Sequence, residues 1–163
     1  MKRGIDAFRG TGTGAHLPHL LALLAELCLR AGRIEAASER LAEARIQVEK
    51  SGERYWEAEL HRLEGEVLLA AANDGAHDED SADRNHGDRA EACFRTALEV
   101  ARRQGARSLE LRAALSLSRV SSRSRSAEAR RVLGGVLETF SEGHDTTDLR
   151  AAREQMAQLS RAD

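Results

Sequence analysis

Three stretches of the chain carry the same spaced pattern: a small residue, a large apolar residue four positions later, and a small or β-branched residue three positions after that. The three sets are Ala37, Leu41 and Ala44; Ala90, Phe94 and Ala97; and Ala129, Leu133 and Val136. Residues separated by steps of four and three lie on one face of an α-helix. A small residue there lets another helix approach closely, while the large side chain fills the gap between neighbouring pairs. The pattern therefore predicts three helices, each packed tightly against a partner helix.

The composition agrees with a helical chain. There is a single proline, only 3% of the residues are aromatic, and Ala, Leu, Glu and Arg dominate. These residue types have the highest helix propensities. The apolar periodicity predicts helices over residues 16–32, 33–52, 52–73, 89–106, 106–122, 126–143 and 145–162. Because the connections are short, consecutive helices should lie antiparallel in an all-α fold.

The spacing between the alanines that open each set indicates a repeat. Ala37 and Ala90 are 53 residues apart, and Ala90 and Ala129 are 39 apart. The tetratricopeptide repeat, a helix pair of about 34 residues, has this small–large–small pattern in its second helix. Its first-helix pattern is matched by Leu21, Leu24, Ala25 and Cys28 and, more weakly, by Gly65 and Leu68. The excess of about 19 residues falls on DGAHDEDSADRNHGD, which we interpret as an insertion at 74–88.

Longer segments resemble a known group of proteins. The segments GERYWEAELHRLEGEVLL, AEACFRTALEVARRQGARSLELRAALSLSR and SEGHDTTDLRAA are similar to the C-terminal tetratricopeptide-repeat region of bacterial adenylate/guanylate cyclase or transcriptional regulator proteins with a STAND-type ATPase. The resemblance implies a right-handed α-solenoid of about three helix pairs over residues 15–143 and a C-terminal capping helix within 144–163. Residues 1–14 would be the remnant of a preceding repeat helix and its turn. The cyclase and ATPase motifs are absent, so their chemistry is not carried over.

In such arrays the first helix of each pair lines a concave groove that binds peptides or helices. The register predicts that six residues face this groove: His19, Ala22, Glu26, Glu59, Arg62 and Glu66. We therefore expect a non-catalytic protein–protein interaction module that serves as a sensing or scaffold part. Its partner would be a protein, a peptide or another domain of a longer parent chain.

The acidic insertion could hold a metal ion or could be a solvated loop. Residues 73–88 carry a net charge of −5. A calcium loop of the EF-hand type needs its glycine one place after Gly87 and a glutamate where Phe94 stands. A zinc site would depend on His77 and His86, nine positions apart. The stretch has no large apolar residue, so we predict a disordered loop. Metal-dependent regulation and recruitment of a basic partner are the alternatives.

A basic stretch follows the insertion. Residues 102–131 carry nine arginines and two glutamates, a net charge of +7. Binding of a polyanion or nucleic acid through this face is the alternative function. Nucleic-acid surfaces usually add aromatic stacking groups or a reading helix, and this stretch contains no aromatic residue. We therefore favour a solvated outer face over nucleic-acid binding.

No catalytic constellation is present in the sequence. His16, His19 and His61 lie in helical segments without a Cys or Ser at a plausible partner spacing. The two cysteines, Cys28 and Cys93, fit packed apolar positions. We therefore expect no enzymatic activity, cofactor or metal. Because no apolar run approaches the roughly 20 residues of a membrane span and no signal peptide is recognisable, we also expect a cytoplasmic protein without a membrane partner.

Overall fold

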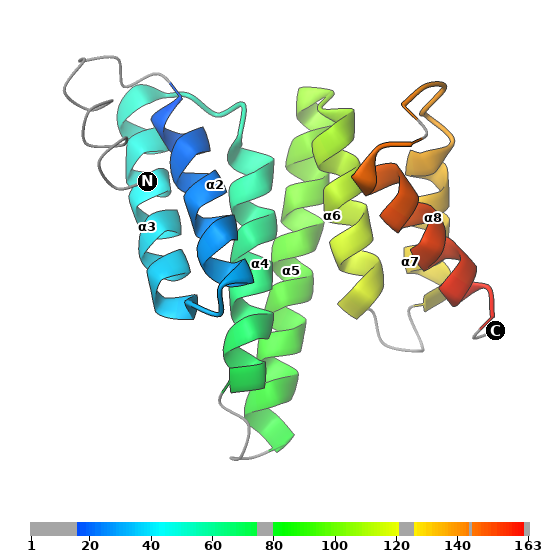
Figure 1. The fold of residues 1–163 in the computed structure, drawn as a ribbon, viewed down its shortest axis with the longest axis horizontal. Helices are drawn as coiled ribbons and strands as arrows, with labels where there is room; N and C mark the ends of the chain where they lie inside the picture. The colour runs from blue at the N-terminus through cyan, green and yellow to red at the C-terminus, as the bar shows by residue number, and fades with distance from the viewer. Residues whose placement is uncertain (1–15, 75–79, 121–125, 144, 162–163) are drawn as a thin grey trace.

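The computed structural model describes residues 16–74, 80–120, 126–143 and 145–161, and every regular element in these ranges is an α-helix (Figure 1). The predicted all-α fold is confirmed for this part of the chain. The helices are α2 (Leu17–Arg30), α3 (Ile34–Ser51), α4 (Glu57–Asp74), α5 (Asp80–Gln104), α6 (Arg107–Val120), α7 (Ser126–Leu137) and α8 (Thr147–Leu159).

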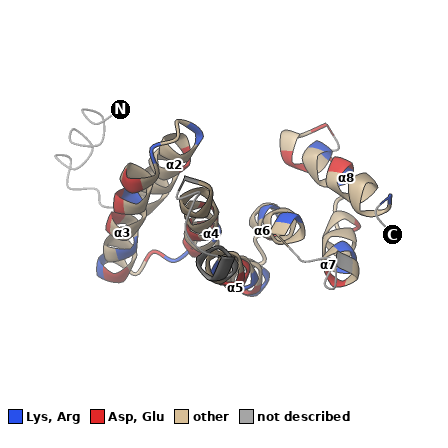
Figure 2. Cartoon of the chain, turned by 90° about the horizontal axis from the view of Figure 1, so that it is seen from below, with Lys and Arg blue, Asp and Glu red and all other residues tan. Residues whose placement is uncertain are grey.

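The helices are arranged in two rows. Each helix contacts the next one along the chain, and three further contacts join α2 to α4, α4 to α6 and α6 to α8. Figure 2 shows α2, α4, α6 and α8 along one side of the molecule and α3, α5 and α7 along the other. The first row is curved, with α2 and α8 at its raised ends. We call the side formed by α2, α4, α6 and α8 the inner face.

The small–large–small sets occupy the core, as predicted. All nine of their residues are at most 3% exposed: Ala37, Leu41, Ala44, Ala90, Phe94, Ala97, Ala129, Leu133 and Val136. The first set packs in a cluster formed by α2, α3 and α4, and the second set packs in a cluster that extends from α5 to α8. The periodicity therefore identified the buried faces of α3, α5 and α7.

Gly65 of α4 faces the ring of Phe94 of α5. A Cβ atom added to Gly65 would lie 2.7 Å from Phe94 Cζ and 2.9 Å from Phe94 Cδ1, and closer still to Cε1. Phe94 is fully buried, so its ring has no solvent to move into. Glycine at this position is therefore required by the aromatic side chain of the partner helix.

Replacing Gly65 with alanine should destabilise the protein even though alanine is the better helix former. Relief of the glycine penalty is worth about 1 kcal/mol, whereas overpacking a filled core costs about 1–3 kcal/mol. We expect a net loss of up to about 2 kcal/mol in urea unfolding. In a Phe94→Leu background the same change should become neutral or favourable, because the clashing ring is absent. An equal cost in both backgrounds would contradict the contact.

Helix boundaries differ from the sequence prediction where a turn is held by tertiary contacts. Gly52 ends α3 as predicted, with φ of 72° and its N–H donating to the carbonyl of Val48. The next helix, however, begins at Glu57, five residues later than predicted. The connection is fastened to the start of α2, because the His16 N–H donates to Glu53 Oε2 at 3.0 Å and the His16 ring contacts the Tyr55 hydroxyl at 2.8 Å.

The structure of the acidic insertion differs from the predicted one. The expected disordered loop over 74–88 is wrong for residues 80–88, because α5 begins at Asp80, and Asp74 is the last residue of α4. Residues 75–79 lie outside the described part. Nucleating a helix costs free energy, whereas extending a helix that packing already stabilises costs little.

Candidate functional site

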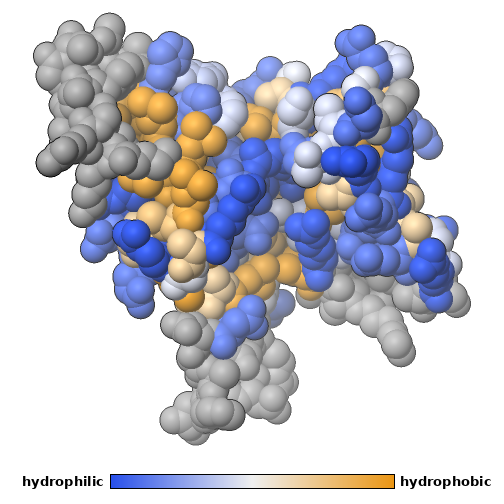
Figure 3. Space-filling model, viewed as in Figure 1, coloured by the Kyte–Doolittle hydropathy of each residue, from blue (hydrophilic) through white to orange (hydrophobic). Residues whose placement is uncertain are grey.

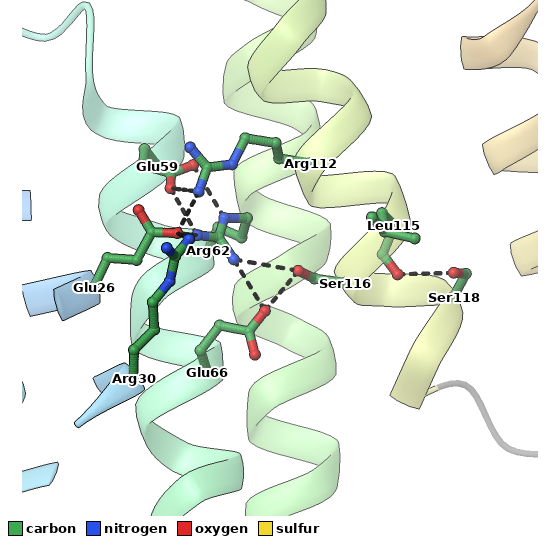
Figure 4. A network of polar contacts seen from close by, with 9 residues as sticks. All are labelled: Glu26, Arg30, Glu59, Arg62, Glu66, Arg112, Leu115, Ser116 and Ser118. Atoms are coloured by element: carbon green, nitrogen blue, oxygen red, sulfur yellow. Dashed lines mark hydrogen bonds and ion pairs between the residues drawn. The ribbon is translucent and has the colours of Figure 1, made fainter. Parts of the chain in front are cut away.

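Seven side chains from α2, α4 and α6 form one polar cluster on the inner face (Figure 4). We call this cluster the inner network; it consists of Glu26, Arg30, Glu59, Arg62, Glu66, Arg112 and Ser116. Arg62 lies at its centre, and its side chain is only 9% exposed. Burial of a charged group at this level is unfavourable unless the charge is paired and hydrogen-bonded.

The guanidinium of Arg62 is satisfied by two carboxylates of its own helix. Its Nε and Nη2 donate to the two oxygens of Glu59 at 3.0 and 2.7 Å, a bidentate arrangement. Its Nη1 donates to Glu66 Oε1 at 3.0 Å. Burial alone would lower the pKa of Arg62, but the hydrogen bond with Glu59 and the surrounding carboxylates outweigh this effect and raise it. Arg62 is therefore held in its charged form.

Helix α6 joins the network through two residues. Arg112 Nη2 lies 2.8 Å from Glu26 Oε1 and 3.0 Å from Glu59 Oε1, which links α6 to both α2 and α4. The Ser116 hydroxyl donates to Glu66 Oε1 at 2.7 Å. Among the buried side-chain nitrogen and oxygen atoms of the described residues, only the indole Nε1 of Trp56 lacks a hydrogen-bond partner. The inner network is thus satisfied internally, and it ties three successive helices of the row together.

A pocket of about 380 Å³ lies beside the network. Its lining residues are Glu26, Leu29, Arg30, Arg62, Leu63, Glu66, Ala70 and Arg119. The side chain of Arg30 is 72% exposed, and Arg119 is exposed as well. Arg30 shares Glu26 Oε1 with Arg112, at 3.0 and 2.8 Å. The pocket lining therefore has more guanidinium than carboxylate groups, and Arg30 and Arg119 are the two that remain open to a ligand.

The structure places the predicted groove residues in different environments. Glu26, Glu59, Arg62 and Glu66 come together in the inner network. Ala22 is 1% exposed and belongs to the core. His19 is half-buried, with its ring centroid 4.1 Å from that of Trp56. Burial and the charge of His16 lower the pKa of His19, and Glu59 opposes this shift.

Sequence reasoning missed the contribution of α6 to this site. Arg112, Ser116 and Arg119 follow one another at steps of four and three, which places them on one face of the helix. That spacing was the available signal. The repeat pattern could not point to it, because its first-helix positions are matched only in the first two pairs, which do not include α6.

The arginines of 102–131 do not share one environment. Arg102 pairs with Glu110 at 2.8 Å, Arg107 donates to the carbonyl of Thr139 at 2.9 Å, and Arg112 belongs to the inner network. Several of the described arginines in this stretch are therefore already engaged within the fold. Arg123 and Arg125 lie outside the described residues.

A second polar group lies between α3 and α4. Arg45 pairs with Glu64 through two of its nitrogens and contacts the ring of His61. Burial and the charge of Arg45 lower the pKa of His61. The neighbouring Cys93 has its thiol pKa raised, chiefly by burial, which favours the unreactive protonated form. Cys28 is buried, and both thiols are free.

In the described ranges, no three or more His, Cys, Asp or Glu side chains are grouped so as to hold a metal ion. His77 of the predicted zinc alternative lies outside these ranges, whereas His86 lies within α5. In the same part of the chain, no helix combines the length and apolar character needed to cross a membrane.

Comparison with known proteins gives one similarity. No family model matches the chain, and no solved structure matches it either. The chain is 37% identical over 112 residues to "Uncharacterized protein R02095" of Rhizobium meliloti (strain 1021). The match covers 69% of this chain and 10% of that relative. The matched region thus corresponds to about a tenth of the length of the curated relative.

Proposed function

We propose that this chain is a non-catalytic, cytoplasmic protein–protein interaction module of the tetratricopeptide type. The array would be a right-handed α-solenoid of about three helix pairs, with α8 as its capping helix. Two observations support this. The contacts α2–α4, α4–α6 and α6–α8 repeat along the chain, as expected when successive helix pairs stack on one another. The close approach of Gly65 and Phe94 occurs where the repeat pattern expects a small first-helix residue against a large second-helix residue.

The inner-face pocket is the site where we propose that a ligand binds. Arg30 and Arg119 are open to solvent at its edge, while the groups behind them are already hydrogen-bonded to one another. A ligand carboxylate can therefore bind to Arg119, and to Arg30 beside its contact with Glu26, while the buried groups of the network keep their hydrogen bonds. Leu29, Leu63 and Ala70 in the same lining can contact an apolar side chain. A peptide that combines an acidic and an apolar side chain fits this chemistry.

The similarity to a much longer protein of Rhizobium meliloti supports a role within a larger protein. A match that covers about a tenth of a much longer protein is the pattern expected of a module that works beside other domains. We therefore propose a sensing or scaffold role in a larger cyclase- or ATPase-type signalling protein. The natural ligand would be a segment of a partner protein or of another domain of such a parent chain.

Selection of a random-peptide display library on the wild-type protein tests this proposal. The enriched peptides should be acidic and should bind Arg119→Glu at least about tenfold more weakly, because one open guanidinium is replaced by a like charge. Arg103→Glu is the matched control, since Arg103 is an exposed arginine of α5 in the opposite row. Affinities can be measured by fluorescence anisotropy with synthesised peptides. Failure to enrich any peptide, or equal weakening by both variants, would contradict an inner-face site.

A further inference from the structure

The pocket on the inner face contains one guanidinium that has no acidic partner in the described part of the chain. The arginines that line the pocket are Arg30, Arg62 and Arg119. The first two already donate hydrogen bonds to glutamates of α2 and α4. Arg119 is exposed, and no ion pair or hydrogen bond joins its side chain to a described residue. Its guanidinium is therefore the one that a ligand can occupy without competition.

The charges around the pocket leave one positive charge uncompensated. In the inner network, three glutamates balance three arginines: Glu26, Glu59 and Glu66 against Arg30, Arg62 and Arg112. Arg119 lies outside this balance and adds a single positive charge at the edge of the pocket. A ligand group with one negative charge neutralises it. A second negative charge on the ligand would instead approach the glutamates of the pocket wall.

The hydrogen-bond donors of the pocket also match a carboxylate better than a phosphate. The planar fork of one arginine donates two parallel hydrogen bonds to the two oxygens of one carboxylate. A phosphate monoester has a charge of about −1.5 to −2 at neutral pH and three terminal oxygens that accept hydrogen bonds. The described lining has no lysine, histidine, serine or threonine, so its side-chain donors are all arginines. One free guanidinium therefore satisfies a carboxylate and leaves a phosphate partly unsatisfied.

Glu66 places negative charge on the wall of this pocket. Its Oε1 accepts hydrogen bonds from Arg62 at 3.0 Å and from Ser116 at 2.7 Å, as Figure 4 shows. Its Oε2 has no hydrogen bond to a described residue, and the side chain is 31% exposed. Repulsion between like charges is stronger in a partly desolvated pocket than in bulk water. Glu66 therefore disfavours a ligand that carries a second negative charge.

The surface around the pocket indicates how a ligand lies in it. Figure 3 shows hydrophilic side chains gathered over α4 and α6, beside an apolar patch along α2. Arg119 belongs to α6, whereas the half-buried Leu29 of the pocket lining belongs to α2. The carboxylate of a ligand would thus lie towards α6 and its apolar group towards α2.

We propose that the inner-face pocket binds a single carboxylate through Arg119, and that Glu66 excludes phosphate and paired acidic groups. Glu66 is then a residue that determines specificity. This inference rests on the function proposed above and narrows its ligand class. The ligand presents one glutamate or aspartate beside an apolar side chain, and neither a phosphorylated residue nor a run of acidic residues replaces it.

Three capped dipeptides serve as probes: acetyl-leucyl-glutamyl amide and the same compound with glutamine or with phosphoserine in place of glutamate. Binding is followed by NMR titration, in which the arginine Nε–H signals are recorded together with the backbone amides. The glutamate probe should shift the Arg119 signal and bind at least about fivefold more tightly than the glutamine probe, because only the glutamate probe carries a charge. The phosphoserine probe should bind several-fold more weakly than the glutamate probe.

The variant Glu66→Gln tests the role of this residue. Glutamine keeps an oxygen that can accept from Arg62 and Ser116 but removes the negative charge. The affinity of the phosphoserine probe relative to the glutamate probe should rise at least about fivefold. The matched control is Glu39→Gln on α3, whose side chain is 68% exposed, and it should leave this ratio unchanged. Circular dichroism checks that both variants keep the wild-type helicity.

The outcomes separate this inference from the proposed function. If the wild type binds the phosphoserine probe more tightly than the glutamate probe, or if other inner-face signals shift while Arg119 does not, the inference is overturned and the inner-face site stands. If no probe shifts an inner-face signal at millimolar concentration, both fail. An unchanged ratio in Glu66→Gln overturns the role of Glu66. The wild-type comparison needs no variant, so it decides the carboxylate preference even if Glu66→Gln does not fold.

Discussion

Replacing Ala90 with arginine is expected to reduce the free energy of unfolding by several kcal/mol. Ala90 is 0% exposed and lies in the cluster shared by α5, α6, α7 and α8. An arginine there has neither space nor a carboxylate partner, and burial of an unpaired charge costs several kcal/mol. Because domains of this size are stable by only about 5–15 kcal/mol, such a loss is a large part of the total stability and lowers the thermal midpoint markedly. Ala129→Arg in α7 should have a similar effect, since Ala129 is 3% exposed.

Each of these variants has a matched control on its own helix. Ala92 lies two residues after Ala90 and is exposed, and Ala127 lies two residues before Ala129 and is also exposed. Ala92→Arg and Ala127→Arg introduce the same side chain into the same helix, so their thermal midpoints should stay within a few degrees of the wild type. Melting followed by circular dichroism separates the two groups. If all four variants melt like the wild type, the small residues do not mediate helix packing.

The success of the sequence prediction at these alanines has a physical cause. Helix packing requires small and large side chains at fixed steps, and such a requirement leaves a pattern in the sequence that can be read without coordinates. The insertion was predicted less well for the opposite reason. Residues 80–88 carry no apolar periodicity in the sequence, so their composition suggested a loop, whereas α5 extends through them.

The candidate site was predictable only in part. The repeat register brought Glu26, Glu59, Arg62 and Glu66 to one face, but it could not show that Glu59 and Arg62 are buried. Charged residues are almost always exposed unless they are paired, and their pairing partners on α6 lie about fifty residues away along the chain. The three-dimensional contact with Arg112 and Ser116 therefore had to come from the structure.

A second large loss of stability is expected when the inner network is disrupted. Glu59→Gln should reduce the free energy of unfolding by about 3 kcal/mol, because it leaves the buried guanidinium of Arg62 and that of Arg112 without their shared carboxylate. The side chain of Glu59 is 2% exposed and lies 2.7 Å from Arg62 Nη2. The control is Glu39→Gln: that side chain is 68% exposed and pairs with Arg40, so its loss should cost at most about 0.5 kcal/mol. Urea unfolding at neutral pH measures both.

A combined variant tests whether charge pairing is the cause. In Glu59→Leu with Arg62→Met, both members of the bidentate pair are replaced by apolar groups. Arg112 still has Glu26 at 2.8 Å, and Ser116 still donates to Glu66 at 2.7 Å. The remaining polar groups are therefore satisfied, and the double variant should be more stable than Glu59→Leu alone by about 2 kcal/mol, since buried pairs are often replaceable by packed apolar side chains. If adding Arg62→Met instead lowers the stability further, Glu59 stabilises the fold through its packing and not through its charge.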